Sequence, residues 1–451
     1  MKLKKNLYLP IEFKHREFRS KILLAFYAIK LGFRVYIGST NSIFKLIEFK
    51  SQKGGIFFFK GGLDFNKIND IKKKCDQFVI LDEELGTEKK NYAKVARVRI
   101  WPGSEKLIDR YYVIGKYGYE ASRNIFPEMQ NSIKCTGWPR VDLWRKENDF
   151  LFKKEADQIK KKYGNFILFS SDFGYISTRF INDALKVYKN SHWKSIRDEF
   201  LTVKKRANEV FEEYNQFLKI LKNYDKIEGL PLIIIRPHPA EDVEAWFETY
   251  KKLKLKNIKV IYEGEITPWI NASLGVLHRG CASAIQAHMR GLPVGHFVCD
   301  NEKLTETPYK ISQHLFSLND IVKFCKTASA NKEMKLIRYH DEFKEMIHVE
   351  NDKLASELII DDLLKLNTSK EMNFQKSSKN MFQDLFINFK ISIINFVKYV
   401  FRFKQYVIAS PTRKIPGGIS KHEVEDFLRR LDNNQNFKVK KILKDCIEID
   451  K

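Results

Sequence analysis

Two short stretches of the sequence end in residue types that bind phosphate. In the first, an apolar strand-like run ends in Arg236-Pro237-His238-Pro239. In the second, another such run ends in Arg279-Gly280-Cys281-Ala282-Ser283. A guanidinium group, an imidazole and a glycine-led turn with a hydroxyl suit an anionic phosphate. Because ligands of open α/β sheets bind beyond the carboxyl ends of the strands, we expect a nucleotide or a sugar phosphate to bind here.

His238 is the candidate catalytic residue of the first stretch. Arg236 and His238 alternate along the strand and so share a face, and the two flanking prolines fix the backbone. An imidazole held in this way can donate to a phosphoryl oxygen or protonate a leaving phosphate. The competing interpretation is a structural histidine with satisfied hydrogen bonds.

The second stretch predicts an anion-binding turn. Gly280 allows a ligand to approach the backbone, and Ser283 with the first amides of the following helix can bind an anion. Simple N-capping by Ser283 is the alternative. No base accompanies Cys281, so we predict no nucleophile there. We assign nucleotide binding to Arg236, His238, Pro239, Arg279, Gly280, Cys281 and Ser283.

An acidic cluster follows a strand-like run in the other half of the chain. Asp82, Glu83 and Glu84 come directly after Phe78–Leu81. Neighbouring carboxylates can raise one another's pKa and so produce a general base near neutrality, which makes these three residues catalytic candidates. The alternative is a solvated acidic loop or a helix start. Neither this spacing nor the six scattered cysteines predicts a metal site.

Strand-like and helical patterns alternate in two successive halves, which predicts an α/β fold of two Rossmann-like domains with a central cleft. We expect an N-terminal domain over residues 1–145 and a C-terminal domain over 146–330, with a helical insertion at about 178–228. A helical return is expected at 331–365. Residues 366–451 are expected to form a linker, an amphipathic helix and a small helical tail. Arg140, at the junction, is a candidate phosphate contact between the domains.

The charge is strongly basic, with 81 Lys and Arg against 56 Asp and Glu and a formal net charge of +25. This excess of positive charge favours three kinds of partner: nucleic acid, an anionic membrane and phosphorylated substrates. Alternatively, the charge reflects only a generally lysine-rich composition. No nucleic-acid-binding motif is present, so we predict no nucleic-acid partner.

The segment Met381–Ile408 has the pattern of a basic amphipathic helix, whose apolar face is formed by Phe382, Phe386, Phe389, Ile393, Phe396 and Val400. Packing against the protein's own core is the alternative. The N-terminus lacks the pattern of a signal peptide, and no apolar run reaches the length of a membrane span. We therefore expect a cytoplasmic protein that is peripheral on the inner membrane face.

The order of these motifs resembles bacterial CMP-sugar transferases with the GT-B fold, the sialyl- and Kdo-type enzymes. More closely, the chain resembles the surface carbohydrate biosynthesis protein family over about residues 5–320. The matching segments are Arg16-Glu17, Asp82-Glu83-Glu84, Thr136 to Asp142, Arg236 to Pro239, and Arg279 to Pro293. Two positions depart from the pattern: Leu85 separates the acids from Gly86, and Gln286 stands where nucleotide-sugar enzymes commonly have Glu.

The resemblance implies a glycosyltransferase of capsule or lipopolysaccharide O-antigen synthesis. Its donor would be a nucleotide sugar, a CMP-sugar according to the resemblance, and its acceptor a glycan or a lipid-linked molecule. One N-domain carboxylate would be the base on the acceptor hydroxyl, His238 would contact or protonate the CMP phosphate, and Ser283 would bind it. CMP is a good leaving group, so no cofactor or metal is required.

Three other functions share these features. The Gly137-Trp138-Pro139-Arg140 segment also resembles CDP-glycerol glycerophosphotransferases, so the donor could be CDP-glycerol or CDP-ribitol. A non-catalytic nucleotide-binding scaffold of polysaccharide assembly would bind nucleotide without turnover. A nucleotide-sugar epimerase has the same two-domain architecture and would also produce an isomerised sugar.

Overall fold

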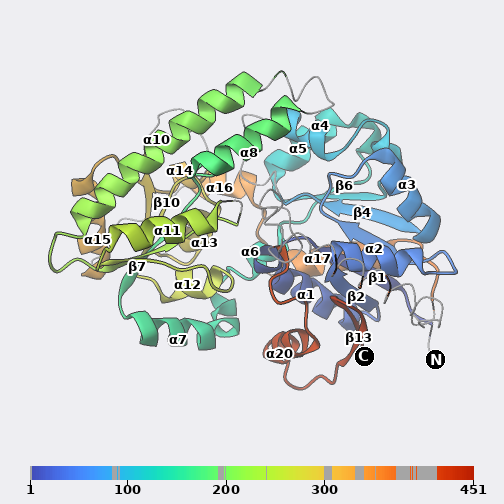
Figure 1. The fold of residues 1–451 in the computed structure, drawn as a ribbon. Helices are drawn as coiled ribbons and strands as arrows, with labels where there is room; N and C mark the ends of the chain where they lie inside the picture. Colours follow the sequence, from blue (N-terminus) through green and yellow to red (C-terminus); the bar gives the residue numbers. More distant parts are fainter. Residues whose placement is uncertain are drawn as a thin grey trace. The chain divides into compact units, whose positions relative to one another are not determined.

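The computed structural model describes residues 3–451 except 84–88, 90–91, 191–197, 199, 240, 299–306, 331–339, 351, 372–385, 387–388, 390–392 and 394–413. The chain divides into two compact units. Unit 1 comprises Met1–Leu143 and His340–Lys451, and unit 2 comprises Trp144–Tyr339. The blue and orange-to-red parts of the ribbon in Figure 1 belong to unit 1, and most of the green and yellow part belongs to unit 2.

Within the described residues, unit 1 is built on a sheet with the strand order β13-β14-β2-β1-β3-β4-β5-β6, and β1 to β6 are parallel. The strands are β1 (Asn6–Ile11), β2 (Arg34–Ser39), β3 (Ile56–Phe59), β4 (Gln77–Leu81), β5 (Arg110–Val113), β6 (Ile133–Cys135), β13 (Lys438–Leu443) and β14 (Cys446–Asp450). The helices are α1 (Lys14–Lys30), α2 (Thr40–Glu48), α3 (Phe65–Lys74), α4 (Tyr92–Arg99), α5 (Lys116–Ile125), α6 (Pro139–Asp142), α16 (His340–Met346), α17 (Ala355–Lys365), α20 (Lys421–Leu431) and the 3-10 helices η1 (Ser104–Leu107) and η2 (Pro127–Met129).

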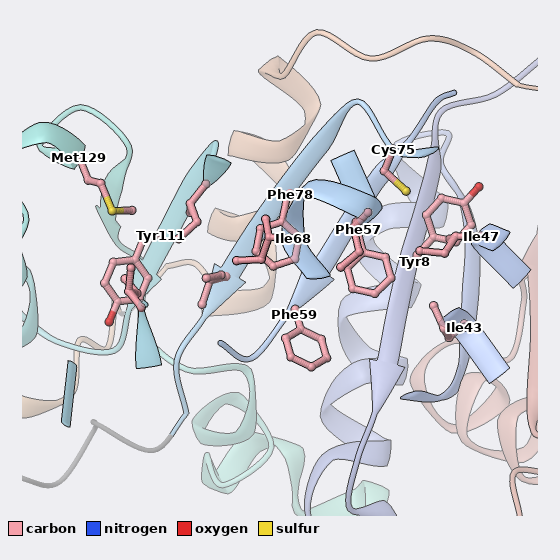
Figure 2. Close-up of a cluster of buried hydrophobic side chains, with 14 of the residues drawn as sticks. Tyr8, Ile43, Ile47, Phe57, Phe59, Ile68, Cys75, Phe78, Tyr111 and Met129 are labelled. Atoms are coloured by element: carbon pink, nitrogen blue, oxygen red, sulfur yellow. The ribbon is translucent and has the colours of Figure 1, made fainter. Parts of the chain in front are cut away.

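A row of aromatic rings fixes the register of this sheet. Tyr36, Tyr8, Phe57 and Phe78 are paired across β2, β1, β3 and β4. The rings of Tyr8 and Tyr36 stack at 5.3 Å, and those of Phe57 and Phe78 at 6.0 Å. Figure 2 shows this buried face, with Ile43 and Ile47 of α2 and Ile68 of α3 packed on it. Because a shift of one residue would turn the whole row to the opposite face, the pairing is strongly specified.

The other face of the sheet is covered by α1, on which α17 and α20 pack. Asp142 ties α17 to the segment after β6, because its carboxylate accepts bonds from the backbone N–H groups of Ala355 at 2.9 Å and Ser356 at 2.8 Å. These bonds satisfy two amides of the first turn of α17 that have no partner within the helix. The helical return therefore belongs to unit 1.

The expected small helical tail is helical in α20, but the residues after α20 form strands. After α20 the chain forms the antiparallel hairpin of β13 and β14, and β14 pairs antiparallel with β2. The hairpin thus extends the first sheet at its β2 side. Lysines at 438, 440 and 441 hid the strand pattern, and its stability comes from pairing with a strand about 400 residues away in the sequence.

Unit 2 has the strand order β12-β11-β10-β7-β8-β9, all parallel within the described residues. Its core on one face joins β7, β8 and β10 to α10, α11 and α15. The strands are β7 (Phe166–Ser170), β8 (Leu232–Arg236), β9 (Ile258–Val260), β10 (Gly275–His278), β11 (Val294–Phe297) and β12 (Gln313–Leu315). The helices are η3 (Lys146–Leu151), α7 (Lys153–Tyr163), α8 (Thr178–Lys189), α10 (Phe200–Tyr224), α11 (Val243–Leu253), α12 (Thr267–Ala272), α13 (Ser283–Met289), α14 (Thr307–Lys310) and α15 (Leu318–Ser329).

The two parallel α/β sheets confirm the predicted fold class, and α8 and α10 occupy the expected helical insertion. The units divide near residues 143 and 339, whereas we expected boundaries at 145 and 330. Apart from Phe386, Phe389 and Ile393, the amphipathic segment Met381–Ile408 lies outside the described residues. Among the helices that the structure describes, none has the length and apolar character to cross a bilayer.

Candidate functional site

Among the described strands, each sheet has a point where the order of its parallel strands reverses, and the residues singled out in the sequence lie at or near these points. In unit 2 the chain runs from β7 outward to β8 and β9 and then returns to β10 on the other side of β7. In unit 1 it runs from β1 to β2 and returns to β3 on the other side of β1. Ligands of such sheets bind beyond the carboxyl ends of the strands at these reversals.

His238 follows β8 in unit 2 and is held through its backbone. Its N–H donates to Oε2 of Glu241 at 2.9 Å, and its carbonyl accepts from the backbone N–H of Glu241 at 2.9 Å. The side chain is partly exposed, whereas Glu241 is fully buried. The backbone at His238 is therefore fixed by Glu241. Sequence reasoning missed Glu241; its place three residues after His238 was the available signal.

The turn at Gly280 is also fixed, by His278 at the end of β10. The backbone N–H of Gly280 donates to Nδ1 of His278 at 3.0 Å, so Nδ1 carries no proton. Nε2 then donates to the Ser312 hydroxyl at 2.8 Å, and that hydroxyl donates to the Pro308 carbonyl at 2.6 Å. Burial, followed by the nearby His296, lowers the pKa of His278 well below its ordinary value, which keeps the ring neutral. Sequence reasoning did not single out His278.

Two buried polar atoms of α13 lack hydrogen-bond partners among the described residues. These are Oγ of Ser283 and Nε2 of Gln286, which lie one helical turn apart, and both side chains are at least 95% buried. Ser283 lies beside the Cys281 thiol, whose pKa is raised by burial and by Asp172. A buried donor without a partner costs free energy, so its presence beside a reversal point favours a ligand there. The raised pKa of Cys281 opposes a nucleophilic role for it.

The two arginines of these stretches are already engaged by the protein. Arg236 donates to the carbonyls of Glu263 at 2.5 Å and Gly264 at 2.8 Å, and burial lowers its pKa to about 10. Arg279 forms a buried ion pair with Glu213 of α10 and donates to the Asp172 carbonyl at 3.0 Å. Both hold loops in place, so direct nucleotide contact by either stays a prediction. The same holds for Pro239, Gly280 and Cys281.

In unit 1, Asp82 forms an ion pair with Arg99. Nε of Arg99 donates to Oδ2 of Asp82 at 2.7 Å, and the same guanidinium donates to the Lys60 carbonyl at 2.5 Å. Asp82 also borders a cavity of about 10 Å³ with Tyr92 and Tyr111, which has room for one water molecule at most.

Glu83 has a different environment. Oε1 accepts from Nε1 of Trp138 at 3.1 Å, and Oε2 has no hydrogen-bond partner among the described residues. Burial alone would raise its pKa, but the charges of Lys21, Arg140 and Arg16 outweigh burial and lower it. Glu83 is therefore a buried carboxylate that stays ionised. Arg140, the predicted phosphate contact, stacks over the Trp138 ring at 4.6 Å. Glu84 lies outside the described residues.

The reversal point of unit 1 is bridged by an ion-pair cluster. Glu12 follows β1 and Lys60 follows β3, and the two form an ion pair that Lys414 joins at 2.5 Å from Glu12. Burial would raise the pKa of Glu12, but these two lysines lower it to about 2. Glu17 of α1 is buried beside them and accepts from the Glu12 backbone N–H at 2.9 Å. Among the described residues, no group of three or more His, Cys, Asp or Glu side chains is arranged to hold a metal ion.

Comparisons with known proteins bear on the fold. No family model and no curated protein matches the sequence, so the family resemblance stays a prediction. The wall teichoic acid polymerase TagF, solved as a histidine-to-asparagine variant, superimposes with a TM-score of 0.50 at 12% identity over 81% of this chain and 89% of TagF. The chain has a GT-B-like fold.

Two further solved structures are similar at lower scores. The UDP-GlcNAc 2-epimerase of Methanocaldococcus jannaschii, in complex with UDP-GlcNAc and UDP, has a TM-score of 0.45 at 13% identity, over 80% of this chain and 99% of the epimerase. A glycosyltransferase from Rickettsia africae has a TM-score of 0.43 at 10% identity, over 81% of this chain and all of that chain. At such identities the likeness concerns the fold, and function has to be argued from the residues.

Proposed function

We propose that this protein is a glycosyltransferase that moves a sugar from a nucleotide donor, CMP-linked, to a glycan acceptor in surface polysaccharide synthesis. The observation that carries the proposal is the pair of unpartnered buried atoms, Oγ of Ser283 and Nε2 of Gln286, beside the strand reversal that His238 also borders. A nucleotide phosphate and its ribose hydroxyls would supply the missing partners.

In this proposal unit 2 binds the nucleotide and unit 1 supplies the base. The acceptor hydroxyl loses its proton to a carboxylate, and its oxygen forms a bond to the anomeric carbon. The bond from that carbon to the phosphate oxygen breaks with its electron pair, and CMP leaves. His238 donates a hydrogen bond or a proton to the phosphate, which stabilises the negative charge that develops there.

Glu83 is the carboxylate that we assign as the base. Asp82 is held by Arg99 at 2.7 Å, whereas Oε2 of Glu83 has no partner among the described residues and the lowered pKa keeps the group ionised. The lowered pKa makes Glu83 a weak base. That is adequate where the donor carbon already carries much positive charge in the transition state. Glu84 remains the alternative base from the sequence.

A donor panel tests the proposal. Purified protein is incubated with CMP-linked acidic sugars, CDP-glycerol, CDP-ribitol and UDP-GlcNAc, with and without candidate glycan acceptors, and release of CMP or UDP is measured. Acceptor-dependent release of CMP from a CMP-sugar supports the glycosyltransferase. Release of CMP from CDP-glycerol or CDP-ribitol alone would replace it with a glycerophosphotransferase, which the Gly137-Trp138-Pro139-Arg140 segment favours as the second candidate.

The same panel separates the remaining functions. Release of UDP together with an isomerised sugar would indicate an epimerase. Tight nucleotide binding without turnover, unaltered when Asp82, Glu83 and Glu84 are all replaced, would indicate a non-catalytic scaffold of polysaccharide assembly.

We further propose that the protein binds an anionic membrane surface through the segment 381–408, close to a lipid-linked acceptor. Phe386, Phe389 and Ile393 lie at helical spacing and are 69%, 66% and 47% exposed. Lysines and arginines at 390, 398, 402 and 404 of the sequence provide the complementary charge.

Point variants are the sharper test of membrane binding, because a truncation at residue 380 would also remove β14, which pairs with β2. We expect the Phe386→Asp, Phe389→Asp, Ile393→Asp variant to lose sedimentation with anionic vesicles. Leu201→Asp is the matched control, since Leu201 on α10 is an exposed apolar residue outside the segment. Equal sedimentation of wild type and the triple variant would exclude the proposal.

A further inference from the structure

Glu241 is a fully buried carboxylate that has no direct part in the transfer proposed above. It lies three residues after His238, just before α11. Burying a carboxylate away from water is costly unless hydrogen bonds or charges compensate. Burial indeed raises the pKa of Glu241, while the Ser171 hydroxyl, the His238 backbone N–H and the His238 charge act in the opposite direction.

Five donors from the described part of the chain converge on this carboxylate. Oε1 accepts from the Ser171 hydroxyl at 2.7 Å and from the backbone N–H groups of Phe173 at 2.6 Å and Gly174 at 3.2 Å. Oε2 accepts from the His238 backbone N–H at 2.9 Å and from Nε1 of Trp246 at 3.0 Å. An ionised carboxylate is a pure acceptor with about four lone-pair sites on its two oxygens, so it suits partners that each offer it a hydrogen.

The five donors come from three separate elements. Ser171 to Gly174 form the loop after β7, the strand at which the order of the sheet reverses. His238 lies in the loop after β8, and Trp246 lies on α11, packed against the rings of Tyr214 and Phe173. One side chain thus sets the backbone of two neighbouring loops at the carboxyl edge and anchors both to a buried helix face.

We propose that Glu241 is a positioning residue that holds the His238 segment and the loop after β7 in the arrangement that binds the donor phosphate. The proposal rests on the donor site proposed above. A glutamine at this position would turn an N–H₂ group toward some of the five donors, and an aspartate would be one methylene too short to reach both loops. Either change releases the loops while the side chain of His238 stays in the protein.

Glu241→Gln and Glu241→Asp test this, with Asp242→Asn as the matched control. Asp242 is the adjacent carboxylate, and it accepts from the Ala245 backbone N–H at 3.2 Å and the Ser177 hydroxyl at 2.9 Å. Ser171→Ala is a milder variant that removes one of the five bonds. Amide hydrogen exchange is measured for peptides covering 171–174 and 232–239, together with kcat and KM for the donor found in the panel.

We expect Glu241→Gln to speed exchange in both loops and to lower kcat/KM about 100-fold, and Ser171→Ala to have a smaller effect in the same direction. Asp242→Asn should change exchange only near its own partners, Ser177 and the start of α11, and not in peptides 171–174 and 232–239. Unchanged exchange in the two loops would overturn the proposal, as would a uniform rise in exchange across unit 2 with kcat/KM retained. If wild-type protein turns over no donor, the proposed function fails, while the exchange measurement still decides whether Glu241 joins the loops.

Discussion

The carboxyl edges of the two sheets are held in different ways. In unit 1 the side chains at the edge are charged and linked to one another, as in Glu12 with Lys60 and Asp82 with Arg99. In unit 2 the loops at the edge are fixed by hydrogen bonds from backbone amides. The His238 N–H donates to Glu241, and the Gly280 N–H donates to His278. Polar side-chain atoms of α13 are left without partners among the described residues there.

This difference separates two chemical tasks. A network of ion pairs can keep a buried carboxylate ionised, as the positive charges around Glu83 do, but it leaves few groups open to a ligand. Preorganised amides and unpaired polar atoms are suited to a ligand that brings its own charge, because they need not reorganise when it arrives. The difference between the two edges agrees with the proposed function, in which unit 1 removes the proton and unit 2 binds the phosphate.

The largest expected effect is at His238. In the proposed transfer, replacing it with alanine removes the group that stabilises the leaving phosphate, so we expect turnover of the confirmed donor to fall by about 10²–10⁴-fold. The measurement is CMP release under saturating donor. His422→Ala is the control, because His422 is exposed on α20 of unit 1. Full turnover by His238→Ala would contradict the proposal that the edge of unit 2 stabilises the leaving phosphate.

The next largest effect distinguishes Glu83 from Asp82 within unit 1. We expect Glu83→Gln to lower kcat about 100-fold with little change in donor KM, because it removes the proposed base and leaves the proposed nucleotide site of unit 2 intact. Asp82→Asn should instead lower stability by about 3–5 kcal/mol, since it leaves the Arg99 charge without its partner. Steady-state kinetics and thermal unfolding of both variants check this. If kcat fell in Asp82→Asn and not in Glu83→Gln, Asp82 would be the base and Glu83 the structural residue.

Glu83 also gives a pH dependence with a definite sign. Because its pKa is lowered, the carboxylate remains the ionised base below the ordinary Glu value of 4.5. We therefore expect kcat to show no loss from protonation of this group between neutrality and pH 4.5. A fall in kcat in that range which is absent from Glu83→Gln would contradict the assignment.

Sequence reasoning located the strand ends but not the residues that fix them. Apolar runs identified β4, β8 and β10, so the positions of Asp82, His238 and Gly280 followed directly. Glu241 and His278 escaped notice because a buried polar residue next to a loop has no periodic signal, and its role depends on amides that other elements bring to it. The sequence of β13 and β14 does not predict a hairpin, because its lysines obscure a strand pattern that pairing with β2 makes favourable.

A smaller effect is expected at His278, where two variants separate its two hydrogen bonds. Asparagine places an acceptor near the position of Nδ1, and glutamine places a donor near that of Nε2. His278→Gln should therefore lose the Gly280 bond and raise donor KM about tenfold, whereas His278→Asn should keep it and lose the Ser312 bond. Both variants should lose similar stability, so equal KM values would show that the turn does not depend on His278.

The smallest effect concerns stability at the edge of unit 1. The pKa of Glu12 is lowered to about 2 by Lys414 and Lys60, so its ionised form favours the folded state. That contribution is complete above the ordinary value of 4.5 and is lost as the pH falls toward about 2. Glu12→Gln should thus destabilise the protein by roughly 0.2–1 kcal/mol at neutral pH, and the difference from wild type should vanish on acidification. Thermal unfolding across this range measures it. If Glu12→Gln remained less stable than wild type at pH 2, Glu12 would stabilise unit 1 through packing and not through its charge. The ion pairs at the edge of unit 1 would then contribute less to the contrast with unit 2.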